Sequence, residues 1–263
     1  MKRLSSLALV IAAIFFATSA SAYVSQWNYS LSGTFIDAKD TNGNSLESGT
    51  TLSWGISTGS GQSQLIINPS AVSSTVDTYL GGGSVPVAFW ADSIDLTHVN
   101  KPIYAPSLDF ATLLVTVILD PFVPNNPALP QQQFAFGIDF TETTNGIIPN
   151  EYDIFALLSG FPNFNIQYDA GDGDGLLDYF INVFPSTGGV LSLLEDPHAE
   201  LAGLEPGTTF GFVTPENRST TLGFSFTIST EPLSTVPEPS TMLLLGAGLF
   251  GLAAIGRKKM RQS

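Results

Sequence analysis

A hydrophobic period of two runs through the middle of the chain, and it limits the fold more than any other feature of the sequence. Apolar side chains alternate with small or polar ones in several segments, among them residues 27–31, 52–56, 134–140 and 222–228. Alternation at this period places the apolar residues on one face of a strand. No stretch between residues 23 and 230 keeps a 3.6-residue period for three turns. We therefore predict an all-β domain over residues 23–230, built as a single two-sheet β-sandwich.

One predicted strand has a different pattern. Residues 113–119 are apolar at nearly every position, which is typical of a central strand covered on both faces. Turn-forming residues separate the predicted strands, as at Gly81 to Ser84. Residues 231–235 form a short tether after the last strand.

The charge of the middle segment excludes one class of partner. Residues 23–236 hold 22 of the 23 acidic residues and only three of the nine basic ones. Such a domain is repelled by phosphate backbones, so we exclude nucleic acid as a partner. Cations and neutral polymers are compatible with it. The chain has no cysteine, which excludes disulfides, thiolate metal sites and cysteine nucleophiles.

The first 22 residues have the three parts of a secretion signal. Lys2 and Arg3 form a basic start, and an apolar run of about ten residues follows them. Ala20 and Ala22 provide the small residues that signal peptidase requires, with cleavage expected before Tyr23. The apolar run is shorter than the roughly 20 residues that span a bilayer, so we predict a cleaved signal peptide and not a permanent anchor.

Residues 236–261 form a second three-part signal at the other end. Val236, Pro237, Glu238 and Pro239 begin it, and an apolar stretch of about 14 residues follows, within a membrane helix expected at about residues 241–256. A basic cluster ends the signal and acts as a stop-transfer sequence that keeps the C-terminus in the cytoplasm, and it consists of Arg257, Lys258, Lys259 and Arg261.

This tail resembles the PEP-CTERM sorting signal, through the Pro-Glu-Pro motif, the glycine-containing apolar helix and the terminal basic cluster. The resemblance covers about a tenth of the chain. It implies recognition by an exosortase, a transpeptidase-like membrane enzyme of Gram-negative bacteria that make exopolysaccharide. It also implies cleavage near Pro237 to Pro239, which are then features of a substrate and not catalytic residues.

The first candidate for chemistry is the motif Thr97-His98-Val99-Asn100. Asp92 and Asp95 lie just before it, so His98 is a candidate metal ligand or catalytic histidine oriented by a carboxylate. A structural histidine that bridges backbone groups at a strand end is the alternative, and we favour it because one histidine alone does not make a zinc site.

The same motif carries a second resemblance. Together with three other segments it is similar to the THxN family of PEP-CTERM proteins, and these segments are Trp54-Gly55, residues 136–145 and residues 153–155. The resemblance implies a secreted protein, with Thr97, His98 and Asn100 as family motif residues. It supplies no catalytic residues.

The second candidate is an acidic loop that resembles a calcium-binding loop. Asp172, Asp174 and Asp178 match the spacing of the calcium ligands, whereas Asp169 is one position away from the place of the first aspartate. An Asp-Gly hairpin turn explains the same residues. Both interpretations stay open, and Ca²⁺ is the one cofactor that the sequence suggests.

The third candidate is a set of acids that includes Asp139, Glu142, Glu151 and Asp153. A pair of carboxylates flanking a sugar would make a glycosidase, but solvated acids at strand ends are the simpler explanation. We therefore expect a non-enzymatic protein of the envelope or exopolysaccharide matrix, anchored in the inner membrane before final sorting. A secreted polysaccharide hydrolase that uses carboxylates or a His98-centred metal is the alternative, and convergence of His98 with two carboxylates in one pocket would favour it.

Overall fold

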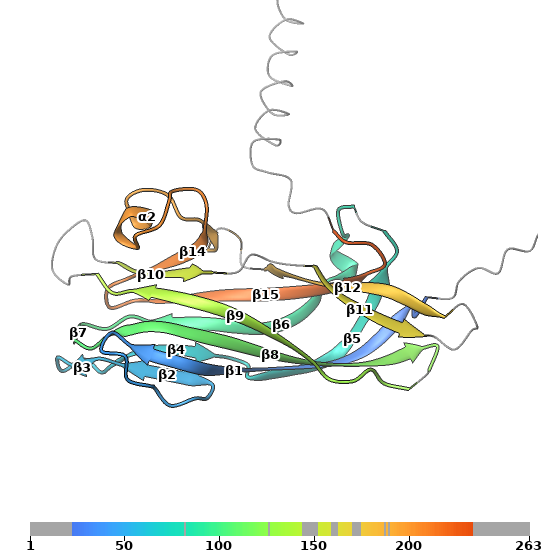
Figure 1. Cartoon of the computed structure of the whole chain (residues 1–263), viewed down its shortest axis with the longest axis horizontal. Coiled ribbons are helices and arrows are strands. Elements are labelled where there is room, and N and C mark those ends of the chain that lie inside the picture. The colour runs from blue at the N-terminus through green and yellow to red at the C-terminus, as the bar shows by residue number, and fades with distance from the viewer. Residues whose placement is uncertain are drawn as a thin grey trace, which may run out of the picture.

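The structure is a computed structural model, and it describes residues 23–81, 83–125, 127–143, 152–158, 163–169, 175–186, 188 and 190–233. Strands make up most of this part, with one short helix, α2 (His198–Leu201), and one 3-10 turn, η1 (Val87–Phe89) (Figure 1). The prediction of an all-β domain is confirmed. Among the residues described, no helix has the length and apolar character needed to cross a membrane. The predicted signal peptide and sorting signal lie outside these residues.

Thirteen strands form one sheet and two form a second, smaller one. The strands are β1 (Gln26–Asp40), β2 (Thr51–Trp54), β3 (Ile56–Ser57), β4 (Ser63–Ile67), β5 (Ala71–Tyr79), β6 (Ala91–Val99), β7 (Ile103–Tyr104), β8 (Leu108–Val123), β9 (Gln132–Thr141), β10 (Tyr152–Leu157), β11 (Asn163–Asp169), β12 (Leu176–Pro185), β13 (Ser192–Leu193), β14 (Phe210–Pro215) and β15 (Ser219–Ser229). The order in the large sheet is β13-β14-β10-β9-β8-β1-β5-β15-β6-β4-β2, with β12 pairing with β15 and β11 with β12.

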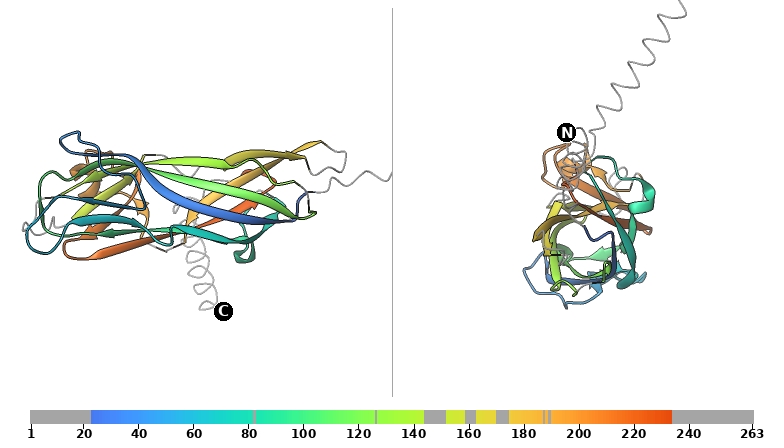
Figure 2. Two further views of the ribbon diagram at one scale, coloured as in Figure 1. Left: turned by 90° about the horizontal axis from the view of Figure 1, so that it is seen from below. Right: turned by 90° about the vertical axis from the view of Figure 1, so that its right-hand side faces the viewer.

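The large sheet folds back on itself, so that its two halves face each other as layers (Figure 2). Strand β5 pairs antiparallel with β1 in the first layer and parallel with β15 in the second. The sequence predicted two separate sheets, whereas here one strand joins the layers. The two layers are joined because β5 pairs with both β1 and β15. The alternation of apolar residues within one strand does not indicate which strands pair with it, so the sequence could not predict this connection.

The alternating residues fill the space between the layers. Trp27 of β1 packs edge-on against Tyr179 of β12, and Tyr29 packs edge-on against Phe226 of β15. Strand β8 was expected to be covered on both faces, but its side chains are buried only at alternate positions, and Ile118 is 43% exposed. Within the described ranges no second layer covers its outer face, so the expectation of two-sided burial was wrong.

Both ends of the described chain are held by the fold. The Val24 backbone N–H donates to the Tyr179 hydroxyl over 2.8 Å, immediately after the predicted cleavage site before Tyr23. At the other end, the Asn163 side chain accepts from the Leu233 N–H over 2.8 Å and donates to the Leu233 carbonyl over 3.1 Å. The ordered contacts therefore continue to Leu233, into the segment predicted as a tether.

Candidate functional site

Strand β6 divides the Thr-His-x-Asn motif between two faces. Thr97 points outward, where its hydroxyl lies 2.8 Å from the hydroxyl of Thr221 on β15. His98 and Asn100 point inward, and neither side chain has any exposed surface. This split follows from the period of two along a strand. Two residues of the motif therefore reach the interior at one end of the sandwich.

His98 lies in an aromatic cage. Its ring stacks on Trp54 with 5.7 Å between ring centroids, and Phe155 and Phe140 pack against it at 4.5 Å and 5.8 Å. Neither ring nitrogen has a hydrogen-bond partner among the described residues, so the expected bridge to backbone groups is not found. Burial lowers the pKa of His98 to about 3, because the interior disfavours the charged imidazolium. The ring is therefore neutral at neutral pH.

Asp153 of β10 lies beside this ring and is only 1% exposed. Its Oδ2 atom is 3.7 Å from His98 Nε2, and its Oδ1 atom accepts from the Thr143 backbone N–H over 3.4 Å. Burial, and after it the negative charge of Glu142, raises the pKa of Asp153 to about 9. The distance to His98 is that of an ion pair, but the two pKa shifts make both partners neutral. We therefore describe the contact as a neutral carboxyl–imidazole pair.

Glu142 is the third titratable residue near His98 and Asp153, and it lies just after the end of β9. Burial, and after it repulsion by Glu216, raises the pKa of Glu142 to about 7, and the neighbouring Trp54 indole acts in the opposite direction. The sequence suggested solvated acids at strand ends. Glu142 and Asp153 are instead withdrawn from solvent, because β9 and β10 direct them towards the cage around His98.

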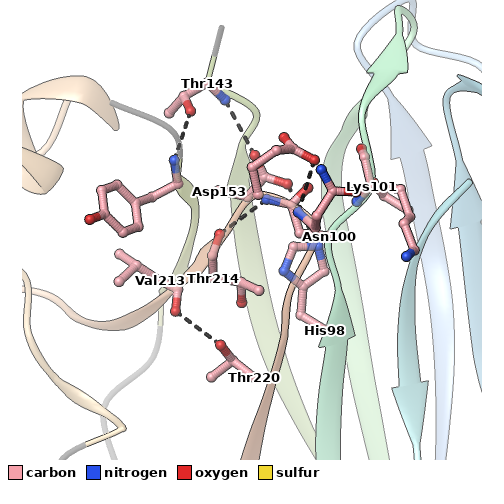
Figure 3. Close-up of polar contacts among 12 residues, drawn as sticks. His98, Asn100, Lys101, Thr143, Asp153, Val213, Thr214 and Thr220 are labelled. Carbon is pink, nitrogen blue, oxygen red and sulfur yellow. Dashed lines mark hydrogen bonds and ion pairs between the residues drawn. The ribbon is translucent and has the colours of Figure 1, made fainter. Parts of the chain in front are cut away.

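Asn100 connects the two layers at the same place (Figure 3). Its backbone N–H donates to the Arg218 carbonyl over 2.9 Å, and its Nδ2 atom donates to the Thr214 carbonyl over 3.0 Å. Thr214 lies in β14 directly opposite Asp153 and has no exposed surface. Sequence reasoning missed Thr214, since a threonine in a strand carries no signal that it faces a buried acid.

The buried group consists of His98, Asn100, Glu142, Asp153 and Thr214, and we call it the polar cluster. His98, Asn100 and Thr214 have no exposed surface, and Asp153 is 1% exposed. A cavity between the layers lies elsewhere and is apolar, lined by residues that include Val115, Phe136, Ile181 and Phe226. A hydrolase would need His98 and two carboxylates to meet in one pocket. His98 does lie near two carboxyl groups, but these side chains are packed in the interior and do not line a pocket that the structure shows.

The candidate calcium ligands are only partly described. Asp172 and Asp174 lie outside the described residues. Asp169 ends β11, and Asp178 lies inside β12, where its Oδ1 atom accepts from Gln167 and Asn165 over 3.0 Å and 3.2 Å. Within the described ranges, no three His, Asp or Glu side chains are grouped so that they hold a metal ion. Calcium binding by this loop stays a prediction.

The polar cluster predicts a dependence of stability on pH. The unfolded chain loses the Asp153 and Glu142 protons near pH 3.8 and 4.5, whereas the folded chain keeps them up to about 9 and 7. Unfolding therefore releases protons, and rising pH favours the unfolded state. His98 acts in the opposite sense, but only below pH 6.5, where the unfolded imidazole binds a proton that the folded ring does not take up until about pH 3.

We expect the melting temperature to fall between pH 6.5 and pH 9, with a loss of up to about 1.4 kcal/mol per pH unit for each proton. Circular dichroism melts across this range measure it. The double variant Glu142→Gln/Asp153→Asn is the control, because it keeps the shape of both side chains and removes their titration. An equally steep fall in that variant would assign the effect to the general acidity of the surface.

Comparison with known protein families finds a sorting motif near the C-terminus. Residues 235–259 match the family model of the PEP-CTERM protein-sorting motif. No curated protein shows significant similarity to the chain. The sorting motif indicates an exported protein that an exosortase processes, destined for the cell surface or the extracellular space. It begins two residues after Leu233, the last residue that the structure describes.

Proposed function

We propose that this exported, exosortase-processed chain is a non-enzymatic β-domain of the cell envelope or exopolysaccharide matrix, of the THxN type. The observation that carries the proposal is a sorting motif that starts directly after the folded domain. The burial of the polar cluster supports it, since His98 has no exposed surface and Asp153 is 1% exposed. Groups in this position serve the interior of the domain rather than a dissolved substrate.

The surface charge supports a matrix location. The domain is strongly acidic, with Lys39, Lys101 and Arg218 as its basic residues between Tyr23 and Val236. Neutral or weakly charged exopolysaccharide and divalent cations are compatible with such a surface. The proposal includes the binding of Ca²⁺ by the acidic loop around Asp174.

Signal peptidase and the exosortase act on the chain as processing enzymes in this proposal. The C-terminal helix holds the chain in the inner membrane of a Gram-negative cell until the exosortase acts. The mature protein then resides at the surface or in the matrix.

A hydrolase is the second candidate, and one observation favours it. His98, Asp153 and Glu142 come from three separate strands or strand ends and meet at one point, with both carboxyl pKa values raised. Groups with strongly shifted pKa values are frequent in active sites. Hydrolysis of the host's own polysaccharide that disappears in Asp153→Asn would establish this candidate in place of the first.

Mass spectrometry of the protein recovered from cells and from matrix tests the first proposal. We expect the matrix form to begin at Tyr23, because Ala20 and Ala22 form the cleavage site, and to end near Pro237 to Pro239. A strain that lacks the exosortase is the control and should yield the chain with its C-terminal basic cluster intact. Recovery of only the uncleaved chain from wild-type cells would contradict the proposal.

A further inference from the structure

Asn100 and Thr214 meet inside the polar cluster, one from each layer of the sheet. Both side chains are completely buried, and Asn100 Nδ2 lies 3.0 Å from the Thr214 carbonyl oxygen. Their other polar atoms, Asn100 Oδ1 and Thr214 Oγ1, have no hydrogen-bond partner among the described residues. Buried polar atoms are nearly always paired. The Asn100 carboxamide therefore lies against the backbone of Thr214 in the interior, and the Thr214 hydroxyl is left without a hydrogen-bond partner among the described residues.

Two carboxyl groups accompany this pair. Asp153 is the direct cross-strand neighbour of Thr214 in the antiparallel β10–β14 pair, so their Cβ atoms are about 5 Å apart on one face of the sheet. Glu142 is close enough to Asp153 to disfavour its ionisation. With its pKa raised to about 9, Asp153 keeps its proton at neutral pH, whereas Glu142, with a pKa of about 7, is ionised in part of the molecules. The polar cluster thus contains a proton donor, Asp153, opposite Thr214 and a proton acceptor, Glu142, near Asp153.

We propose that the chain joins Thr214 to Asn100 through an intramolecular ester bond. Thr214 Oγ1 attacks the side-chain carbonyl carbon of Asn100, and the ionised carboxylate of the Asp153–Glu142 pair takes the hydroxyl proton. The tetrahedral intermediate collapses as the bond from this carbon to Nδ2 breaks, and the nitrogen leaves as ammonia with the proton of the other carboxyl. One C–O bond forms, one C–N bond breaks, and the reaction needs no oxidant or cofactor.

The surroundings suit such a bond. The aromatic rings of Trp54, Phe140 and Phe155 pack against His98 in the same site, and a site closed to water protects an ester from hydrolysis. Asn100 and Thr214 are separated by 114 residues in the chain. A covalent bond between them would restrict the unfolded state as a disulfide does, in a chain without cysteine. This inference goes beyond the proposed function and does not depend on it.

Peptide mapping of the purified full-length protein tests the bond. Digestion of the denatured chain after glutamate leaves Asn100 in a fragment that ends at Glu142 and Thr214 in one that ends at Glu216. We expect the two fragments to appear as one species, lighter than their sum by one ammonia molecule. Brief alkaline treatment should separate them, because it hydrolyses an ester and leaves amides intact.

Three variants complete the test. Thr214→Val removes the hydroxyl at nearly constant volume and should give separate fragments, whereas Thr214→Ser keeps a hydroxyl and should retain the joined species. Asp153→Asn removes a proton-transferring group and should lower the joined fraction at least tenfold, as expected for the loss of general acid–base catalysis. Separate wild-type fragments of full mass would overturn the proposal. So would an ammonia loss that persists in Thr214→Val, which would indicate ring closure of Asn100 onto the Lys101 nitrogen.

Discussion

Replacement of Pro237, Glu238 and Pro239 by alanine is expected to abolish release of the protein from the membrane. These residues lie within the matched sorting motif, and they precede the apolar stretch and the basic cluster that ends at Arg261. The variant keeps the apolar helix and the cations that resist translocation, but it loses the segment that the exosortase recognises. Cell fractionation and immunoblotting should then find nearly all of the chain with the membrane.

The matched control for this experiment is Glu231→Ala. Glu231 lies upstream of the motif. Its replacement by alanine removes one negative charge, as the replacement of Glu238 does. This variant should be released like the wild type. Normal release of the triple variant would show that the exosortase does not depend on these residues, and the assignment of their role would have to be withdrawn.

His98→Ala is expected to lower the free energy of unfolding by about 2–4 kcal/mol. The ring is fully buried and fills a cage formed with Trp54, Phe140 and Phe155. Its removal leaves a cavity among stiff aromatic groups that cannot collapse around it. Chemical denaturation at pH 7, followed by tryptophan fluorescence, measures the change.

His98→Phe separates packing from polarity at this position. Phenylalanine keeps an aromatic ring, slightly larger than the imidazole, and removes two nitrogens that have no hydrogen-bond partner among the described residues. The cost should therefore stay below about 1.5 kcal/mol, as for other swaps that nearly conserve volume. If His98→Phe destabilises the domain as much as His98→Ala, the ring nitrogens have a partner in solution. A bound ion or an ordered water would then account for the effect.

The strands could be predicted from the sequence because their signal is local. Alternation at residues 27–31, 134–140 and 222–228 identified β1, β9 and β15, since one buried face requires an apolar residue at every second position. The pairing of these strands could not be predicted. Strand β5 joins both layers through contacts with β1 and β15, and such non-local contacts depend on the whole chain. The continuous apolar run in β8 also gave a wrong prediction of two-sided burial, because Ile118 is exposed.

Only some residues of the candidate site could be predicted from the sequence. The Thr-His-x-Asn motif identified His98 and Asn100, because histidine is rare in this chain and the motif is compact. The sequence predicts Glu142 and Asp153 as solvated acids, and it gives no signal for Thr214. Burial of an acid depends on what packs over it, and for Asp153 this is the ring of His98 from the opposite layer.

The sequence by itself determined where the chain is sent and what class of fold it adopts. Sorting signals are read as linear segments, and the match at residues 235–259 needs no tertiary structure. The period of two likewise follows from the geometry of a single strand. Only the tertiary structure decided that Asn100, Asp153 and Thr214 meet, because β6 and the β10–β14 pair lie in different layers. Their shared burial raises the pKa of Asp153 and places the Asn100 carboxamide against the Thr214 backbone carbonyl. No local pattern in the sequence records a contact across 114 residues.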